Sequence, residues 1–261
     1  ATKQVDLNFA NPKVFVEAAK ILNFYAEKGA GLIRLDAIGY LWKRLGSSSI
    51  HEPEAHALVS AMAEVLALAY PQVITVSEVN EPQDRSFTYL GSSERPEADL
   101  VYQFSHFPLA IHAIHTGNAE FYQSWLASMN EVGGRQFVTV LGSHDGMGLK
   151  PVRGILPDGE LEKLSTLLVE QCGCKPNYAV LPGGSKIIYE ICATPWNLVN
   201  TSNSRLDFET QLARYSVVLI LGLSVRGLPA IYFNGIFGAE NYAPSGGLDE
   251  NRTVNRENTS S

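Results

Sequence analysis

Three acidic residues each follow a short apolar segment of the chain. Asp36 comes after GLIRL, Glu78 after VITVS, and Asp145 just after FVTVLGSH. If these segments are strands of a parallel sheet, the three carboxylates lie at strand carboxyl ends, where α/β barrels place their catalytic groups. A single acid at such a position is as often a helix cap or a solubilising loop residue. Three of them together favour a catalytic site built from carboxylates.

Arg34 and Glu78 indicate how two of these acids differ. Side chains alternate between the two faces of a strand, so Arg34 and Asp36 point the same way, towards the barrel axis if the strand belongs to a barrel. A guanidinium beside a carboxylate keeps that carboxylate ionised, which suits a nucleophile. Glu78 has apolar Val76 and Val79 nearby in the sequence. Burial there would raise the pKa of Glu78, as an acid that protonates a leaving group requires.

Asp36 and Glu78 are therefore a candidate nucleophile and acid/base pair for a retaining glycosidase-type mechanism. Asp145, which follows His144, would orient sugar hydroxyls and stabilise an oxocarbenium-like transition state. A rival interpretation makes the three acids ligands of a divalent cation. Arg34 argues against it, because its positive charge would lie where the cation should.

The segments that must position these acids alternate between the apolar pattern of a helix and that of a buried strand. Apolar residues recur at helical spacing in residues 13–27, 54–70, 119–129 and 208–225. Short apolar segments typical of buried strands are residues 31–36, 73–78, 99–104, 137–141 and 229–233. Strands that alternate with helices predict a parallel α/β sheet.

Residues 149–205 interrupt this alternation with Gly, Pro and Cys. We expect an irregular insertion there, with a short helix near residues 160–171, and long excursions of this kind often serve as functional lids. The sequence predicts one partial catalytic barrel over residues 1–242, which includes this insertion. Residues 243–261 form a polar tail.

The composition excludes several classes of partner. The chain has 261 residues, of which 45% are hydrophobic and 18% charged, so it can bury a core. Its 27 acidic and 20 basic residues give a net charge of −7 without a Lys/Arg cluster, which argues against nucleic acid as a partner. The longest apolar stretch, residues 217–225, is far shorter than the ~18 residues of a membrane span, so no membrane partner is expected.

The cysteines indicate the compartment. Cys172, Cys174 and Cys192 are odd in number, and the first two are too close in sequence for an ordinary bridge. This pattern predicts thiols in a reducing compartment. The first residues show no signal-peptide pattern, so a cytoplasmic location is expected.

Four segments carry a resemblance to a known family. GLIRLDAIGY at 31–40, VITVSEVN at 73–80, VLGSHDGMG at 140–148 and RTVNRE at 252–257 occur in that order. They resemble the α-amylase superfamily, and specifically its branch of sucrose phosphorylases and glucosylglycerate phosphorylases. The resemblance covers nearly the whole chain and implies an α/β fold, a partial (β/α)8 TIM barrel with roughly strands 4 to 8. The first three strands and the C-terminal β-domain of the family have no counterpart in this sequence.

The resemblance also implies roles for single residues. Asp36 is the nucleophile, Glu78 the acid/base and Asp145 the transition-state stabiliser. In this family an α-glucosidic bond is cleaved, a β-glucosyl-enzyme forms, and inorganic phosphate attacks it to give α-glucose 1-phosphate with retention. No organic cofactor and no catalytic metal are implied, and phosphate is a co-substrate. The residues expected to bind substrate are Arg34, His144 and Arg252.

The predicted function is therefore a retaining phosphorylase of small α-glucosides of the sucrose or glucosylglycerate type. Gly39 and Tyr40 stand where starch-cleaving members usually carry Lys-His, which disfavours a polysaccharide amylase and its calcium site. A retaining α-glucosidase or transglucosidase, and an inactive barrel fragment, stay open as alternatives. Because five strands cannot close a barrel, we expect the chain to be a piece of a longer enzyme with little activity by itself. The expected partners are a sugar substrate and phosphate; no oligomeric state is predicted.

Overall fold

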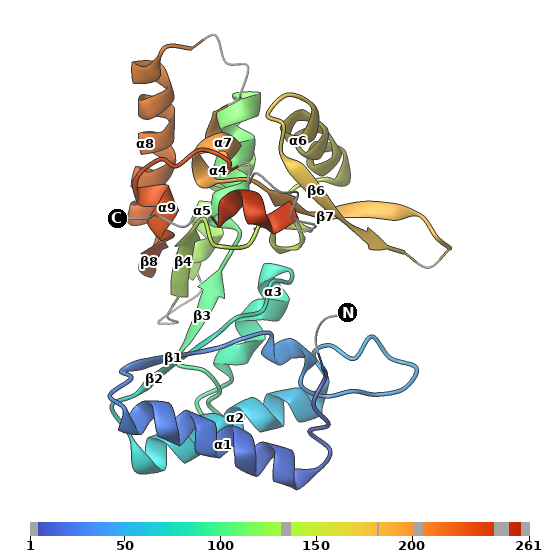
Figure 1. Cartoon of the computed structure of the whole chain (residues 1–261), viewed down its shortest axis with the longest axis vertical. Helices are drawn as coiled ribbons and strands as arrows, with labels where there is room; N and C mark the ends of the chain where they lie inside the picture. Colours follow the sequence, from blue (N-terminus) through green and yellow to red (C-terminus); the bar gives the residue numbers. More distant parts are fainter. Residues whose placement is uncertain (1–4, 132–136, 182, 201–205, 243–250, 257–261) are drawn as a thin grey trace. The chain divides into compact units, whose positions relative to one another are not determined.

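The computed structural model describes residues 5–131, 137–181, 183–200, 206–242 and 251–256 (Figure 1). The described α-helices are α1 Pro12–Glu27, α2 Pro53–Ala69, α3 Gln83–Ser86, α4 His106–Thr116, α5 Glu120–Glu131, α6 Asp158–Glu170, α7 Pro195–Val199, α8 Phe208–Ser224 and α9 Phe233–Ile236. The described strands are β1 Leu32–Leu35, β2 Ile74–Ser77, β3 Leu100–Gln103, β4 Phe137–Leu141, β5 Met147–Gly148, β6 Lys175–Val180, β7 Lys186–Cys192 and β8 Leu228–Ile231. Short 3-10 helices are η1 Ile38–Tyr40, η2 Phe87–Leu90, η3 Lys150–Val152 and η4 Asn251–Asn255.

Five strands form one sheet in the order β1-β2-β3-β4-β8. β1 pairs with β2 in parallel, from Leu32 opposite Ile74 to Leu35 opposite Ser77, and β2 pairs in parallel with β3. Each of these strands lies within two residues of the segment predicted from its apolar pattern. The predicted alternation of strands and helices is confirmed.

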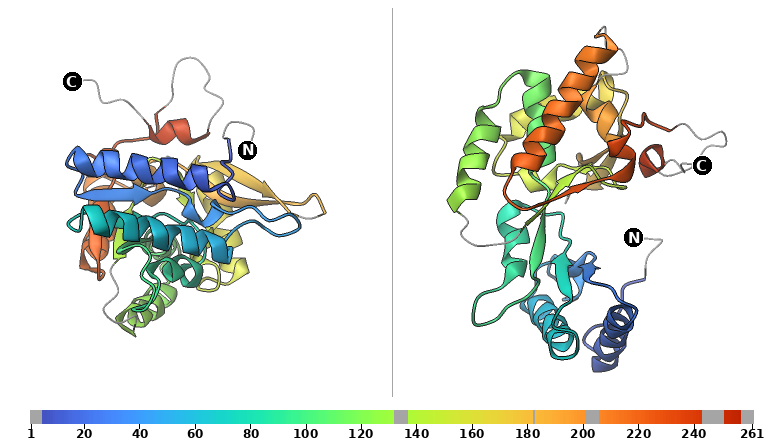
Figure 2. Two further views of the ribbon diagram at one scale, coloured as in Figure 1. Left: turned by 90° about the horizontal axis from the view of Figure 1, so that it is seen from below. Right: turned by 90° about the vertical axis from the view of Figure 1, so that its left-hand side faces the viewer.

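The chain divides into two compact units. Unit 1 comprises residues 1–102 and 135–138, and unit 2 comprises residues 103–134 and 139–261. In unit 1, α1 and α2 lie side by side (Figure 2). α1 begins where the Asn11 side chain accepts a hydrogen bond from the Lys13 N–H, and it ends before Gly29, whose φ of 92° requires a residue without a side chain.

Unit 2 has its own core, in which α4, α7 and α8 pack together. The apolar residues Leu109 and Ile111 of α4 are buried, and so are Leu198 of α7 and Val218 of α8. Close packing of α8 depends on Gly222, because a Cβ there would overlap Leu141 of β4 and lie 2.7 Å from Nε2 of His106.

The segment 149–205, expected to be irregular, contains regular structure. The helix expected at 160–171 is present as α6. Beyond it, β6 and β7 form an antiparallel hairpin, and β7 also pairs with β5 (Figure 1). Pro176 and a register irregularity at Asn177 and Tyr178 obscure the strand pattern of β6, which is why the sequence did not predict the hairpin.

Of the predicted polar tail, residues 251–256 are described and contain η4. The other residues of the tail lie outside the described ranges. No helix within those ranges is both long enough and apolar enough to cross a lipid bilayer.

Candidate active site

Arg34 contacts two of the three predicted acids, and all three residues belong to unit 1. Its Nη1 lies 2.7 Å from Oδ1 of Asp36, and its Nη2 lies 3.8 Å from Oε2 of Glu78. One guanidinium therefore faces both carboxylates of the predicted catalytic pair.

The strands explain this arrangement. On β1, Ile33 and Leu35 are buried, whereas the alternate residue Arg34 is turned to the opposite face. The Glu78 N–H donates to the Leu35 carbonyl at 2.9 Å, which continues the β1–β2 pairing one step beyond β2. Asp36 and Glu78 therefore follow adjacent parallel strands at the same edge. The predicted common direction of Arg34 and Asp36 is confirmed by their ion pair.

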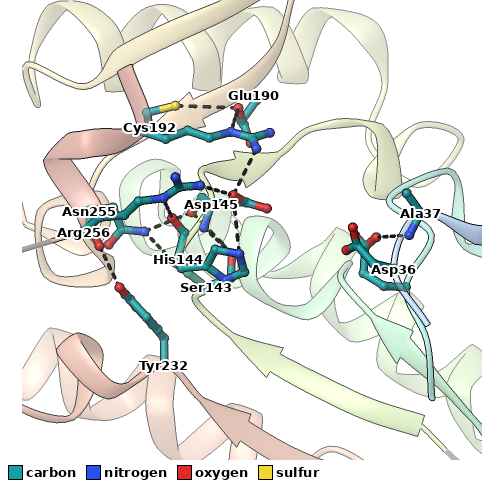
Figure 3. Close-up of polar contacts among 12 residues, drawn as sticks. Asp36, Ala37, Ser143, His144, Asp145, Glu190, Cys192, Tyr232, Asn255 and Arg256 are labelled. Atoms are coloured by element: carbon teal, nitrogen blue, oxygen red, sulfur yellow. Dashed lines mark hydrogen bonds and ion pairs between the residues drawn. The ribbon is translucent and has the colours of Figure 1, made fainter. Parts of the chain in front are cut away.

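Ala37 joins this cluster through its backbone. Its N–H donates to Oε2 of Glu78 at 3.1 Å (Figure 3). Its φ of 50° is left-handed, a conformation that costs a residue with a Cβ about 1–2 kcal/mol. The strained residue directly after Asp36 thus supplies a donor to the neighbouring carboxylate, and strained residues of this kind cluster at functional sites.

The two carboxylates have different surroundings. The side chain of Asp36 is 65% exposed and that of Glu78 only 14%. The Arg34 guanidinium also lies over the ring of Tyr102, 5.7 Å from its centroid. Burial is the main cause that raises the pKa of the Tyr102 phenol, so this ring stays neutral. One acid is thus exposed and paired with arginine, and the other is mostly buried. A nucleophile and an acid/base require different surroundings of this kind.

Asp145 is the centre of a second cluster, which lies within unit 2 (Figure 3). Its Oδ1 accepts hydrogen bonds from Nη1 of Arg252 at 3.0 Å and from Nη2 of Arg256 at 2.8 Å. Nε2 of His144 lies 3.7 Å from the same oxygen. The carboxylate thus faces two guanidinium groups and an imidazole.

Residues 251–256 are attached to the turn that carries Asp145. The Asn255 amide donates to the carbonyl oxygens of Ser143 and Asp145, and Nε of Arg256 donates to the His144 carbonyl at 3.0 Å. The Tyr232 hydroxyl donates to the Asn255 carbonyl at 2.9 Å. These bonds hold both arginines at the carboxylate.

Glu190 of β7 holds Arg252 from the other side. Nε and Nη2 of Arg252 donate to its two carboxylate oxygens, and the amide of Asn177 donates to Oε2 at 2.7 Å. Only 3% of the Glu190 side chain is exposed. Burial alone would favour a neutral Arg252, but hydrogen bonds and charge from Glu190, with the charge of Asp145, raise its pKa above the ordinary value.

The structure thus brings the predicted site residues together in two sets. Arg34, Asp36 and Glu78 meet in unit 1, and His144, Asp145 and Arg252 meet in unit 2. Within the described part of the chain, no group of three or more His, Cys, Asp and Glu residues has the arrangement of a metal site.

Two members of the second set, Arg256 and Glu190, were not predicted from the sequence. Arg256 lies in the same RTVNRE segment as Arg252, four residues on, and this spacing was the available signal. Glu190 is the single charge inside the apolar run IIYEIC. A charge in such a run indicates a buried residue with a specific partner.

Comparisons with known proteins identify the family. The family model of the α-amylase catalytic domain matches residues 1–154, the part that contains Asp36, Glu78 and Asp145. The glucosylglycerate phosphorylase of Allomeiothermus silvanus is 38% identical over 237 residues, which is 90% of this chain and 42% of that protein. Glucosylglycerate phosphorylase of Escherichia coli is 34% identical over 256 residues, covering 97% of this chain and 45% of that protein. The chain therefore spans less than half the length of these relatives.

A solved structure supports the fold. The sucrose 6F-phosphate phosphorylase of Thermoanaerobacter thermosaccharolyticum superposes with a TM-score of 0.72 at 20% identity, over 92% of this chain and 45% of that chain. At 20% identity this structural similarity supports the fold alone. Together with the family match it confirms the predicted partial (β/α)8 barrel.

Proposed function

The chain belongs to the α-amylase family through its catalytic domain, and from that premise we propose that it carries the catalytic acids of a retaining glucoside phosphorylase. The proposed reaction transfers the glucosyl group of a small α-glucoside to inorganic phosphate and gives α-glucose 1-phosphate. Relatives named glucosylglycerate phosphorylase, 38% and 34% identical, favour glucosylglycerate over sucrose as the substrate type.

The observation that carries this proposal is the position of Arg34 between Asp36 and Glu78. Of the two carboxylates, Asp36 is the nearer to the guanidinium, with 2.7 Å between Nη1 of Arg34 and Oδ1 of Asp36. An ionised carboxylate is the nucleophile that a retaining mechanism needs. Glu78, mostly buried on the adjacent strand, fits the acid that must hold a proton until the leaving group takes it.

The proposed reaction has two steps. In the first, Asp36 attacks the anomeric carbon, the glycosidic bond breaks, and Glu78 gives its proton to the departing oxygen. In the second, Glu78 takes a proton from phosphate, and the phosphate oxygen displaces Asp36 from the anomeric carbon. Two inversions give net retention. These steps use carboxylates alone and require neither an organic cofactor nor a metal ion.

Asp145 has the third proposed role, stabilisation of positive charge on the sugar in the transition state. Arg252 and Arg256 hold its carboxylate in one orientation, which supports a preorganised group. We further propose that His144 and Arg252 contact the glucosyl group and that the reaction is cytoplasmic, because Cys172, Cys174 and Cys192 are all thiols.

α-Glucosyl fluoride with and without inorganic phosphate tests the proposal, since fluoride leaves without protonation and replaces the unknown natural leaving group. Glucose 1-phosphate and free glucose are measured. We expect glucose 1-phosphate only when phosphate is present, and at a low rate, because the chain covers less than half the length of its relatives. Free glucose at the same rate in both reactions would favour a retaining glucosidase or transglucosidase instead. No turnover would favour the third alternative, an inactive fragment of a barrel, since the chain covers less than half the length of its relatives.

Variants assign the roles of the two acids. Asp36→Asn should abolish turnover, because the amide is not a nucleophile. Glu78→Gln should still cleave α-glucosyl fluoride but lose activity on glucosides with poor leaving groups, for which protonation is required. Asp84→Asn is the matched control, because Asp84 lies in unit 1 with its side chain 78% exposed. Its activity should equal that of the unaltered chain.

A further inference from the structure

We propose that Cys172 and Cys174 form a redox-active pair, which a hydroperoxide converts reversibly into a disulfide within the chain. The two residues are separated by Gly173 and lie between α6 and β6 in unit 2. Both are thiols, as is Cys192. No part of the proposed transferase reaction uses them.

Cysteines separated by one residue are too close in sequence for an ordinary bridge, but the turn between Cys172 and Cys174 brings their Cα atoms into the range that a disulfide spans. Gly173 has a φ of 64°, a left-handed conformation that turns the chain between the two cysteines. Residues two apart are at most about 7 Å apart even when extended, and a turn shortens this into the range of Cα separations that disulfides span. The Cys174 thiol donates to the Cys172 carbonyl oxygen, with 3.9 Å between Sγ and the oxygen.

Arg214 makes the two thiols chemically different. This arginine of α8 donates from Nη2 to the Val199 carbonyl at 3.1 Å, and its buried Nε has no hydrogen-bond acceptor among the described residues. Its charge favours the thiolate of Cys172. The neighbouring Cys174 thiol, followed by the charge of Arg214, lowers the pKa of Cys172 against the opposing effect of burial. The pKa of Cys174 is raised by the neighbouring Cys172 and by burial.

The reaction follows from this difference. The Cys172 thiolate attacks one oxygen of hydrogen peroxide, the O–O bond breaks, and Cys172 sulfenic acid forms with release of hydroxide. The sulfur of Cys174 then attacks the sulfenic sulfur and displaces hydroxide, while the Cys174 proton converts it to water. In total, two thiols lose two electrons and two protons, and one peroxide becomes two waters. A dithiol reductant reverses the reaction by thiol–disulfide exchange.

Oxidant reaches the pair through the turn between α6 and β6. Cys172 is 0% exposed and Cys174 4%, but Gln171, Gly173 and Lys175, which flank and separate them, are exposed. A helix end followed by exposed residues opens locally at a lower free energy than the whole fold. Peroxide is small enough to react during such an opening.

Cys192 provides an internal control. It is buried on β7, where the Asn177 amide donates to its Sγ at 3.3 Å and Oε2 of Glu190 lies 3.7 Å away. Burial and the neighbouring carboxylate raise the pKa of Cys192 to about 12. We therefore expect this thiol to stay reduced under conditions that oxidise the pair.

The test is peptide mass spectrometry of the folded chain after a brief exposure to hydrogen peroxide and alkylation of the remaining thiols. Trypsin does not cut between Lys175 and Pro176, so one peptide, residues 164–186, contains both Cys172 and Cys174, and another, 187–205, contains Cys192. We expect peptide 164–186 to lose two hydrogen atoms and both alkylation sites, and to recover them after treatment with dithiothreitol. Peptide 187–205 should stay alkylated.

Two variants sharpen the test. Cys174→Ser should leave Cys172 as a sulfenic acid that dimedone captures, and Arg214→Gln should slow disulfide formation several-fold. A cross-link between the two peptides, oxidation of Cys192 before the pair, or no disulfide in the folded wild-type chain would each overturn the proposal. None of these readouts depends on glucosyl transfer.

Discussion

Arg252 donates two parallel hydrogen bonds to Glu190, from Nε to Oε2 at 3.0 Å and from Nη2 to Oε1 at 2.8 Å. The third nitrogen of the same guanidinium donates to Oδ1 of Asp145 at 3.0 Å. Glu190 lies on β7 and Arg252 on η4. One buried carboxylate therefore fixes the orientation of the guanidinium that reaches Asp145, and it also attaches η4 to the hairpin.

Glu190→Gln should lower the free energy of unfolding by about 2–3 kcal/mol, because it leaves the charge of Arg252 without its main partner in a mostly buried site. Urea denaturation followed by circular dichroism measures the change. Glu162→Gln, on the exposed face of α6, is the control and should change the value by less than about 0.5 kcal/mol. Adding Arg252→Gln to Glu190→Gln should cost less than the sum of the single changes; strict additivity would show that the two side chains do not interact.

Glu190→Gln should also lower the pKa of the Cys192 thiol. Burial and the charge of Glu190 together raise that pKa to about 12, and the variant removes the charge. The pH dependence of Cys192 alkylation, measured on its tryptic peptide, gives the pKa as the midpoint of the profile. A change in how often the fold opens would alter the alkylation rate at every pH and leave this midpoint in place. An unaltered midpoint in the variant would contradict the influence of Glu190 on this thiol.

The sequence predicted those parts of the site that depend on local periodicity. The apolar run before Asp36 was sufficient to identify β1, and the alternation of a strand was sufficient to place Arg34 and Asp36 on one face, as their ion pair confirms. Acids at the ends of β1 and β2 meet because adjacent parallel strands end at one edge. The catalytic and substrate-binding roles given to these residues stay predictions.

The sequence could not predict contacts that depend on distant pairing. Arg252 and Glu190 are 62 residues apart, and they meet only because β6 and β7 form a hairpin that the apolar pattern did not indicate. The position of Arg256 depends on the same tertiary contact, since η4 is too short to be stable by itself. The sequence carries a signal for Glu190 and for Arg256, but their contacts with Arg252 and Asp145 follow only once the hairpin and η4 are placed against the turn at Asp145.

Ala37→Gly should stabilise the chain, since Ala37 has a φ of 50° that glycine adopts without strain. Relief of about 1–2 kcal/mol of strain is partly offset by the greater freedom of glycine in the unfolded chain, so we expect a net gain of roughly 0.5–1 kcal/mol. Thermal or urea unfolding measures it. Ala63→Gly within α2 is the control and should destabilise by about 1 kcal/mol. A loss of stability in Ala37→Gly would show that the left-handed conformation is not strained.

His106 should make the stability of the chain fall in mild acid. It is 0% exposed, its Nδ1 lies 3.0 Å from the Tyr122 hydroxyl, and burial lowers its pKa to about 4. Above pH ~6.5, the ordinary pKa of histidine, the ring is neutral in both the folded and the unfolded chain. The lowered pKa therefore does not change the free energy of unfolding there. As the pH falls from there to about 4, only the unfolded chain takes up the proton, and the free energy of unfolding falls by a total on the order of 3 kcal/mol.

Urea unfolding at several pH values between 4 and 7 measures this dependence, and histidine NMR gives the native pKa directly. His106→Gln should flatten the slope, whatever its stability at neutral pH, because glutamine does not titrate. Titration of His106 near pH 6.5 in the folded state would contradict the prediction, because it would show that burial does not lower the pKa of this ring.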